Sequence, residues 1–447
     1  MAVPTTGLET LTRLKGIVEG PLYNKLLSFI QSVEKEIQPH VDSYIASGLL
    51  IRETDPLKFI ATLLVALQKN IPTFLGNPNW GLTEWEQVFD TVNPKVFGPL
   101  PTQNIQPSAK ENIHSLDLFQ NYLMIPTGGT TGQLRFTVHD WKNLLTSTKT
   151  TQDFLNLSTL NAYNTLPLYH VSGLMPIIRA LTTGGDVVFC DYKEWLKGNF
   201  PIHLLLNPIL SLVPTQLEEL LKFPSAIQFL KNFHTIFVGS GPCLHSILNK
   251  AKEHQLPISL VYGMTETCSM VCAIPSSEFL LGNYSIATPL SRNTFTVDEE
   301  QLIHIQSPSN FYGYYPNPPI KYQIWKTHDR GLIHQNGRIA IIGRTDRILI
   351  TGGEKVDPQE VEASILKTGL AHKAVVTSIP DLKWGQKIVC AYISTRLHST
   401  KDLAIQLKPL LTSYKLPKIL LQVAEIPTTS TGKIDYLKIQ QLFNHSS

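Results

Sequence analysis

The stretch YLMIPTGGTTGQLRFTVH, residues 122–139, sets a run of Gly and Thr between two apolar segments, with Arg135 just downstream. Gly tolerates positive φ angles, so a Gly-rich loop turns several backbone N–H groups toward one point, and Thr hydroxyls add further donors. The sequence therefore indicates a phosphate-binding loop after a strand, although it also fits a tight glycine turn between two strands. It is not a Walker A loop, which requires GxxxxGK[ST].

The composition is that of a globular protein larger than one ordinary domain. The 447 residues are 43% hydrophobic and 16% charged, and 38 Lys and Arg stand against 35 Asp and Glu, which gives a formal net charge of +3. No run of five or more basic residues occurs. We therefore expect two domains, one of them large, and no nucleic-acid partner.

Cysteine usage and hydropathy indicate in which cellular compartment the protein resides. The five cysteines are an odd number and form no CxxC pair, which favours a reducing environment. The longest apolar stretch, FIATLLVAL at residues 59–67, is far shorter than the roughly 20 residues of a membrane-spanning helix. We expect a cytoplasmic protein without a transmembrane segment. The sequence does not reveal the oligomeric state.

The chain changes its pattern near residue 122. The first hundred residues show helical spacing of apolar residues, as in 22–37, and end in the Pro-rich loop FGPLPTQNIQP at 97–107. Beyond residue 122, apolar strands such as 235–240 and 258–263 alternate with helical segments. The fold class predicted for residues 1–345 is α/β, with packed helices covering sheets.

The pattern resets after Gly343. The sequence predicts a strand pair in RIAIIGRTDRILITGG (338–353), a helix at 357–368, strands at 372–380 and 387–394, and a helix from Asp402. These elements suffice for a small α+β domain. We place the boundary between Thr345 and Asp346, so residues 346–447 form the second domain.

Seven motifs occur in the order found in one enzyme family. The motifs are PTGGTTGQLR (126–135), LPLYHVSGL (166–174), SLVPTQL (211–217) with VGSGPC (238–243), VYGMTETCS (261–269), KTHDRG (326–331), GRTDRILITGGEKVDPQEVE (343–362) and TSTGKIDYLKI (429–439). They resemble the phosphate loop, the PLFHxxGL element, the YGxTE signature, the TGD motif, the hinge and the terminal GK motif of that family. Along nearly all of its length after residue 120, the chain resembles adenylate-forming enzymes of the acyl-CoA synthetase family.

The resemblance implies ATP, Mg²⁺ and CoA as cofactor and co-substrates. Such enzymes join a carboxylate to the α-phosphate of ATP and then let a thiol displace AMP, and fixed donors must meet the charge that develops. Glu266 is implied as the Mg²⁺ ligand, a role suited to one carboxylate plus phosphate oxygens, and Thr265 as a contact of the α-phosphate. The other implied nucleotide contacts are Thr127, Gly128, Gly129, Thr130, Thr131, Gly132 and Arg135 at the β- and γ-phosphates, Gly239, Ser240, Gly241, Pro242, Tyr262 and Gly263 around adenine, and Asp329 with Arg344 at the ribose.

The second domain carries the remaining implied residues. Lys433 in the GK motif bridges the attacking carboxylate and the α-phosphate in this family, a role that fits a compact ammonium on a flexible stem. The lid then rotates about a pivot that corresponds to Asp346, and Gly352 and Gly353 line the pantetheine tunnel. Read without the motifs, Lys433 is an ordinary solvated lysine and Asp346 an ordinary turn residue.

Some positions depart from the family pattern. The phosphate loop has Gly128 for Ser, Leu134 for Pro, Arg135 for Lys and Phe136 for Gly, so that a hydroxyl is lost while a cation is kept. Likewise His328 replaces the Gly of TGD, and Tyr436 replaces the usual Arg after the GK motif. These departures bear on the rate more than on the reaction type.

The identity of the acid substrate is also inferred from the resemblance. The short chain, LPLYHVSGL, SLVPTQL and the start of the lid most resemble family members that activate o-succinylbenzoate in menaquinone and phylloquinone biosynthesis. The benzoate of that dicarboxylate stays charged, so its pocket requires a cation or polar donors. Arg179 is the candidate cation, with a snorkelling helix arginine as the alternative. His170 and Gly263 are candidates to border the acyl pocket, and a core histidine is the alternative for His170.

Three other functions remain open at this stage. A medium-chain or aryl acyl-CoA ligase would share every nucleotide contact and differ only in the acyl pocket. A stand-alone adenylation enzyme would load a carrier protein instead of CoA. A non-catalytic nucleotide-binding relative is the third reading, because the phosphate loop is altered.

Overall fold

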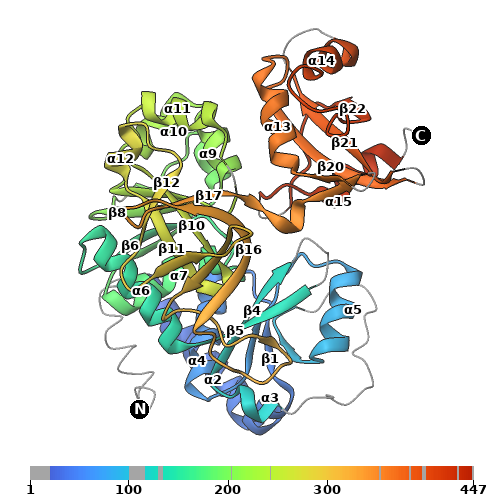
Figure 1. Cartoon of the computed structure of the whole chain (residues 1–447). Coiled ribbons are helices and arrows are strands. Elements are labelled where there is room, and N and C mark those ends of the chain that lie inside the picture. Colours follow the sequence, from blue (N-terminus) through green and yellow to red (C-terminus); the bar gives the residue numbers. More distant parts are fainter. Residues whose placement is uncertain are drawn as a thin grey trace. The chain divides into compact units, whose positions relative to one another are not determined.

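The chain forms two compact units. The computed structural model describes residues 21–99, 116–128, 134–202, 204–241, 243–351, 354–381, 384–394, 399–429 and 432–444. The first unit comprises Met1–Asp298, His304–Thr327 and Ile333–Ala340, and the second comprises Glu299–Ile303, His328–Leu332 and Ile341–Ser447 (Figure 1). The expected boundary between residues 345 and 346 stays a prediction.

The first unit contains a six-stranded sheet in the order β15-β5-β4-β2-β1-β3. Its strands are β1 (Leu49–Ile51), β2 (Thr73–Leu75), β3 (Lys95–Phe97), β4 (Tyr122–Gly128), β5 (Leu134–Asp140) and β15 (Tyr314–Tyr315). The helical reading of the first hundred residues was therefore wrong for three short strands. Strands β1 and β2 are only three residues long and wholly buried, so no alternation of apolar and polar residues marks them. Most of the Pro-rich loop, from residue 100 onward, lies outside the described residues.

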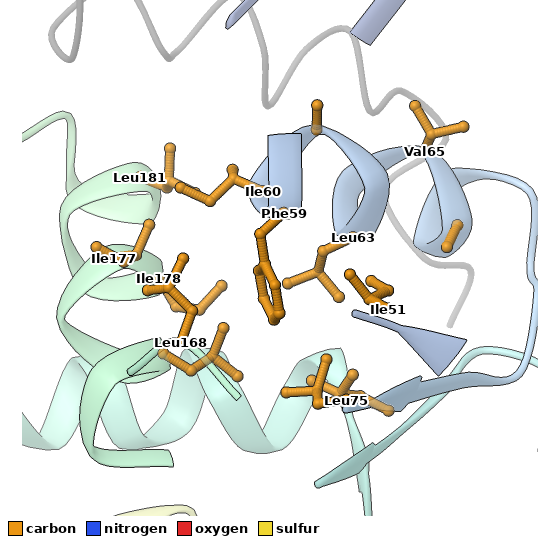
Figure 2. Packing of buried hydrophobic residues seen from close by; sticks show 14 of the residues in the cluster. Ile51, Phe59, Ile60, Leu63, Val65, Leu75, Leu168, Ile177, Ile178 and Leu181 are labelled. Carbon is orange, nitrogen blue, oxygen red and sulfur yellow. The ribbon is translucent and has the colours of Figure 1, made fainter. Parts of the chain in front are cut away.

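Successive side chains along the strands of this sheet pack on opposite faces. Leu50, Phe74, Met124, Phe136 and Val138 pack with α5 (Leu82–Thr91) on one face. Their neighbours along the strands face the other way and pack against α4 (Pro56–Gln68) and α7 (Val171–Thr183). Figure 2 shows part of this second cluster, with Phe59 of α4 lying between the labelled side chains of α7 and Leu63.

A longer sheet runs through most of the first unit, in the order β13-β14-β16-β17-β12-β11-β10-β9-β8-β6-β7. Its strands are β6 (Asn161–Asn164), β7 (Val187–Phe189), β8 (Pro208–Leu212), β9 (Thr235–Val238), β10 (Ile258–Met264), β11 (Ser269–Ile274), β12 (Ile286–Pro289), β13 (Thr294–Val297), β14 (Leu302–Gln306), β16 (Ile324–Ile333) and β17 (Ile339–Arg344). The pairs from β7 to β10 are parallel, and those from β10 to β17 are antiparallel. Buried runs such as TIFV in β9 suit a parallel sheet that is covered on both faces.

In the sequence, the remaining helices of the first unit come before the first strand or between two strands. They are α2 (Pro21–Ile37), α3 (Val41–Ser47), α6 (Trp141–Leu155), α8 (Tyr192–Leu196), α9 (Pro214–Leu220), α10 (Pro224–Leu230), α11 (His245–Glu253) and α12 (Ser276–Leu280), with the short 3₁₀ helices η2 (Gln38–His40), η3 (Leu116–Phe119) and η4 (Thr265–Thr267). Local chemistry fixes their starts: the carboxylate of Asp140 caps α6 by accepting from the backbone N–H of Asn143 at 2.8 Å.

The second unit is the small α+β domain that the sequence predicts. Strands β18 (Leu349–Thr351), β19 (Glu354–Val356), β20 (Lys373–Asp381), β21 (Gly385–Ile393) and β22 (Ile419–Gln422) form one sheet, with helices η5 (Thr345–Arg347), α13 (Pro358–Lys367), α14 (Thr400–Leu407) and α15 (Tyr436–Asn444). Val376 and Cys390 face α13 and α14, whereas Val375 and Val389 face α15. The orange and red part of Figure 1 shows these helices around the sheet.

The strand pair expected in residues 338–353 was wrong in its pairing. The two strands are β17 and β18, but β17 belongs to the eleven-stranded sheet and β18 pairs with β19 and β21. The short helix η5 separates them, so they do not form a hairpin. Among the described residues, no helix combines the length and apolar composition that crossing a bilayer requires.

Candidate functional site

The parallel half of the long sheet brings four sequence motifs to one edge. Strands β6, β8, β9 and β10 run parallel to one another, so their carboxyl ends meet where open α/β sheets bind their ligands. His170 follows β6, Pro214 follows β8, Gly239 follows β9 and Thr265 follows β10. Residues from distant parts of the sequence are thereby gathered at one edge within the first unit.

The Gly/Thr loop connects an antiparallel hairpin. Strands β4 and β5 pair from Tyr122 with Asp140 to Gly128 with Leu134, so residues 129–133 join two antiparallel strands. Thr127 is half-buried opposite an exposed Arg135. Gly129, Thr130, Thr131 and Gly132 lie outside the described residues. The phosphate role of the loop stays a prediction.

The YGMTETCS motif forms a sharp turn, which we call the acidic turn (residues 264–269). Cys268 and Ser269 both have positive φ angles, 56° and 98°. A Cβ on Gly263 would lie 2.1 Å from the carbonyl oxygen of Ser269, so only glycine fits there. Thr265 and Glu266 are half-buried in this turn, and their roles at the α-phosphate and the Mg²⁺ ion stay predictions.

A second segment holds the acidic turn, and we call it the clamp segment (residues 307–315). The backbone N–H of Phe311 donates to the carbonyl of Glu266 at 2.8 Å, and the hydroxyl of Ser309 donates to the carbonyl of Thr267 at 2.9 Å. The hydroxyl of Tyr314 donates to Oε1 of Glu266 at 2.5 Å. Sequence reasoning missed these residues, although the aromatic run FYGYY at 311–315 was a signal.

The clamp segment is itself supported from beneath. The side chain of Asn143 donates to the carbonyl of Asn310 at 2.9 Å and to Nδ1 of His139 at 3.2 Å. His139 is fully buried, and burial first, then the nearby charge of Lys321, lowers its pKa to about 3. His139 is therefore neutral at physiological pH, and its Nδ1 acts as an acceptor.

The residues predicted to surround adenine lie in β10 and in the loop after β9. A Cβ on Gly239 would lie 2.7 Å from the side chain of Val261, so this glycine permits close packing of the two strands. Ser240 has a positive φ of 70°, and Gly241 is exposed. Tyr262 is half-buried in β10. Pro242 lies outside the described residues.

The two residues predicted to lie at the ribose form an ion pair with each other. In the second unit, Nη1 of Arg344 donates to Oδ1 of Asp329 at 2.9 Å, and Asp329 is buried. The arginine therefore holds one oxygen of the carboxylate that is predicted to bind the ribose hydroxyls. His328, which replaces a glycine of the family pattern, is exposed, and its carbonyl accepts from the hydroxyl of Thr345 at 3.1 Å.

Arg179 is buried and does not snorkel. The residue is 5% exposed on α7, and burial lowers the pKa of its guanidinium to about 10, so it remains charged at neutral pH. Its Nη2 donates to the hydroxyl of Ser269 at 2.9 Å, whereas its Nε has no hydrogen-bond partner and its guanidinium no carboxylate partner among the described residues. The side chain also lines a small cavity with Pro176, Asn161 and Ser211.

His170 begins α7 directly after the edge of the sheet. It is the N-cap residue of that helix, with φ −108° and ψ 147°, and it is half-buried. Gly173 donates its backbone N–H to the carbonyl of His170 at 3.0 Å, and a Cβ there would lie 2.2 Å from the carbonyl of Pro167. A side chain at position 173 would therefore clash, which explains the glycine of the HVSG sequence.

The second unit holds Lys433 on an exposed turn. The backbone N–H of Thr429 donates to the carbonyl of Lys433 at 2.7 Å, and Gly432 takes a positive φ of 75°. Asp346 lies in η5, while Gly352 and Gly353 lie outside the described residues. Tyr436, where the family has Arg, lies with its ring 4.9 Å from the guanidinium of Arg347.

The chain matches the model of one protein family. The family is described as AMP-binding enzyme, and the match covers residues 51–315. The chain belongs to the AMP-binding enzyme family. This result agrees with the motif order and with the edge of the sheet at which the motifs lie.

The chain is similar to two proteins, one of which matches in two solved structures. A 2-succinylbenzoate–CoA ligase of Enterococcus faecalis is 28% identical over 383 residues, which cover 81% of this chain and 77% of that protein. The o-succinylbenzoate CoA synthetase of Bacillus subtilis is 19% identical in its complex with the acyl-adenylate OSB-AMP, with a TM-score of 0.73 and coverage of 92% and 91%. The same synthetase with ATP and magnesium gives a TM-score of 0.71 at 19% identity, with coverage of 92% and 93%.

A structure named for a different enzyme matches equally well. ATP-bound MatB from Rhodopseudomonas palustris is 18% identical, with a TM-score of 0.77 and coverage of 97% of this chain and 98% of that one. These likenesses confirm the predicted fold, the acyl-CoA synthetase-like α/β architecture with a small C-terminal domain. These likenesses do not by themselves identify the acid substrate.

Proposed function

We propose that the chain is an AMP-forming acid–thiol ligase that adenylates o-succinylbenzoate with ATP and transfers the acyl group to CoA. The proposal extends the membership of the AMP-binding enzyme family. Further support comes from the relatives, which are named as 2-succinylbenzoate–CoA ligases. The reaction would serve menaquinone or phylloquinone biosynthesis.

The observation that carries the choice of acid is the buried guanidinium of Arg179. A buried cation without a counter-charge is costly, and a bound carboxylate would offset that cost. Among the described residues, Arg179 makes one side-chain hydrogen bond, to Ser269, and no ion pair. An acid with two carboxylates leaves one for Arg179 and one for activation. A fatty acid would leave the cation uncompensated.

The reaction has two displacement steps. In the first, a carboxylate oxygen of the succinyl arm attacks the α-phosphorus of ATP, an O–P bond forms, and the bond from phosphorus to the bridging oxygen breaks as pyrophosphate leaves. In the second, the sulfur of CoA attacks the acyl carbonyl, a C–S bond forms, and the C–O bond to AMP breaks. The thiol proton passes to solvent.

Residues of this chain are proposed to meet the charge of the first step. Lys433 would bridge the carboxylate and the α-phosphate, and Thr265 would donate to the α-phosphate. Glu266 fits a magnesium ligand, because its half-buried carboxylate has one oxygen engaged by Tyr314 and no cation in contact among the described residues. Bound Mg²⁺ would neutralise phosphate charge.

We infer a cytoplasmic location, because ATP and CoA are co-substrates and the thiols of Cys268, Cys272 and Cys390 are buried and reduced. Burial raises the pKa of Cys268 to about 12, so this thiol is not reactive at neutral pH.

The experiment is a panel of acids assayed for pyrophosphate release with ATP and Mg²⁺, followed by thioester formation with CoA. We expect o-succinylbenzoate to be turned over far better than 4-oxo-4-phenylbutyrate, which has the same arm but lacks the ring carboxylate. Octanoate serves as the apolar control. Efficient use of 4-oxo-4-phenylbutyrate or octanoate, with none of o-succinylbenzoate, would refute the assigned acid and leave a general acyl-CoA ligase.

Two further outcomes separate the other functions. Pyrophosphate release without CoA acylation, together with loading of a phosphopantetheine carrier protein, would identify a stand-alone adenylation enzyme. Nucleotide binding without pyrophosphate release for any acid would identify a non-catalytic relative.

A further inference from the structure

Tyr314 connects two parts of the proposed nucleotide site that are distant in sequence. Its hydroxyl donates to Oε1 of Glu266, and the guanidinium carbon of Arg135 lies 4.4 Å from the centre of its ring. Arg135 comes from the hairpin that carries the Gly/Thr loop, and Glu266 from the acidic turn. One side chain of the clamp segment therefore touches the predicted cation of the phosphate loop and the predicted metal ligand.

The ring of Tyr314 is held in place by other aromatic side chains. Phe311 packs edge-on against it with ring centres 5.0 Å apart, and Trp325 lies 6.2 Å away. The indole N–H of Trp325 points to the sulfur of Met264, the first residue of the acidic turn, at 3.3 Å. The tyrosine is thus fixed to the same turn through both its hydroxyl and its neighbours.

The hydroxyl of Tyr314 is the donor in its contact with Glu266, because a carboxylate oxygen accepts. A cation over the ring strengthens such a donor, and a planar guanidinium stacks on an aromatic face better than an ammonium does. This preference gives a reason for Arg at position 135, where the family has Lys.

We propose that Tyr314 is a positioning residue for the nucleotide's magnesium ion. It fixes one oxygen of Glu266 so that the other oxygen is left for the metal, and its ring packs against the guanidinium of Arg135. The inference rests on the proposed nucleotide chemistry, but not on the identity of the acid.

The chain provides a matched control two residues away. The hydroxyl of Tyr312 donates to Oδ2 of Asp140 at 2.7 Å, and the ammonium of Lys321 lies 4.7 Å from the centre of its ring. Tyr312 thus makes the same two kinds of contact as Tyr314, but with a carboxylate that caps a helix. Loss of either hydroxyl removes a hydrogen bond to a carboxylate, but only loss of the Tyr314 hydroxyl affects Glu266.

The test measures binding of α,β-methylene ATP by calorimetry at several Mg²⁺ concentrations, with AMP as the ligand that needs no metal. In Tyr314→Phe we expect the Mg²⁺ concentration for half-maximal binding to rise about tenfold, as for the loss of one hydrogen bond to a charged group. AMP affinity should not change. Tyr312→Phe should keep the wild-type Mg²⁺ dependence, although both variants lose a similar amount of thermal stability.

A second pair of variants tests the link to Arg135. Arg135→Lys should weaken binding of the Mg²⁺ complex in the wild-type background and have a smaller effect in Tyr314→Leu, because the ring that seats the guanidinium is then missing. Equal effects in the two backgrounds would refute the coupling.

The outcomes separate this inference from the proposed function. An unchanged Mg²⁺ dependence in Tyr314→Phe, or an equal shift in Tyr312→Phe, would overturn the role of Tyr314 even if the enzyme uses o-succinylbenzoate. A wild-type protein that binds the Mg²⁺ complex but does not activate o-succinylbenzoate would refute the acid and leave the role of Tyr314 intact. Absence of Mg²⁺-dependent binding in the wild type would overturn both.

Discussion

Glu266 and Lys433 differ in how the fold holds them. The acidic turn around Glu266 is fixed by hydrogen bonds from Phe311, Ser309 and Tyr314. Lys433 lies on an exposed turn of the second unit, which is closed by backbone hydrogen bonds with Thr429. The group proposed to hold a metal in one place is built into a packed network. A group proposed to act in one step only is on a short, solvent-facing turn.

The largest effect expected from this comparison is in Lys433→Ala. Loss of the bridging ammonium should slow acyl-adenylate formation by roughly a thousandfold. Thioester formation from supplied acyl-adenylate should be nearly unaffected, and so should the melting temperature, because the side chain is exposed. Pyrophosphate release and CoA consumption measure the two steps separately. The control is Lys438→Ala, an exposed lysine of α15 in the same unit, and equal loss in both steps would contradict the assignment.

The next prediction concerns Asp346, the proposed pivot, which lies in η5 of the second unit. Asp346→Pro fixes φ at the proposed pivot, so it should preserve adenylation and impair thioester formation. Asp346→Ala removes the side chain while keeping backbone freedom, and we expect it to retain both steps. Single-turnover assays of each half-reaction distinguish the variants. Unchanged overall turnover in the proline variant would remove Asp346 as the pivot.

Arg179, the residue proposed to bind the acid, lies in the first unit like Glu266 but is more deeply buried. Arg179→Ala should raise the Michaelis constant for o-succinylbenzoate roughly thirtyfold, since truncation leaves a carboxylate unpaired in a buried site. The constant for ATP should stay the same. Ser269→Ala keeps the cation and loses only its hydrogen bond, so its effect should be smaller. Unaltered dependence on the acid in Arg179→Ala would eliminate this residue and spare the substrate.

The smallest effect expected is on stability and comes from His139 beneath the clamp segment. Its pKa of about 3 in the folded protein lies below the usual value near 6.5. At pH values between these two, His139 of the unfolded chain therefore binds a proton that the folded protein does not bind. Stability should therefore be lost as pH falls from 6.5 toward 3, by at most about 1.4 kcal/mol per pH unit. Urea unfolding between pH 6.5 and 5 should show a flatter slope in His139→Gln. Exposed His234→Gln should keep the wild-type slope, and an identical slope in all three proteins would refute the contribution.

Short-range patterns in the sequence predicted the elements best. The segments after Tyr122 contain strands β9 and β10 near their expected places, and the helices and strands expected at 357–368, 372–380 and 387–394 were also confirmed. The short strands β1, β2 and β3 were missed, because three buried residues carry no period. The pairing of β17 and β18 was misjudged, since pairing depends on the sheet each strand joins.

The sequence by itself determined the order of the motifs, the residue types that the proposed chemistry needs, and the glycines at which a side chain would clash. These are properties of local spacing and of single residues. Only the tertiary structure decided which side chains hold them. Tyr314 meets Glu266 across 48 positions and Arg179 meets Ser269 across 90. Contacts of that range arise from the packing of sheets and helices, and no local pattern in the chain encodes them.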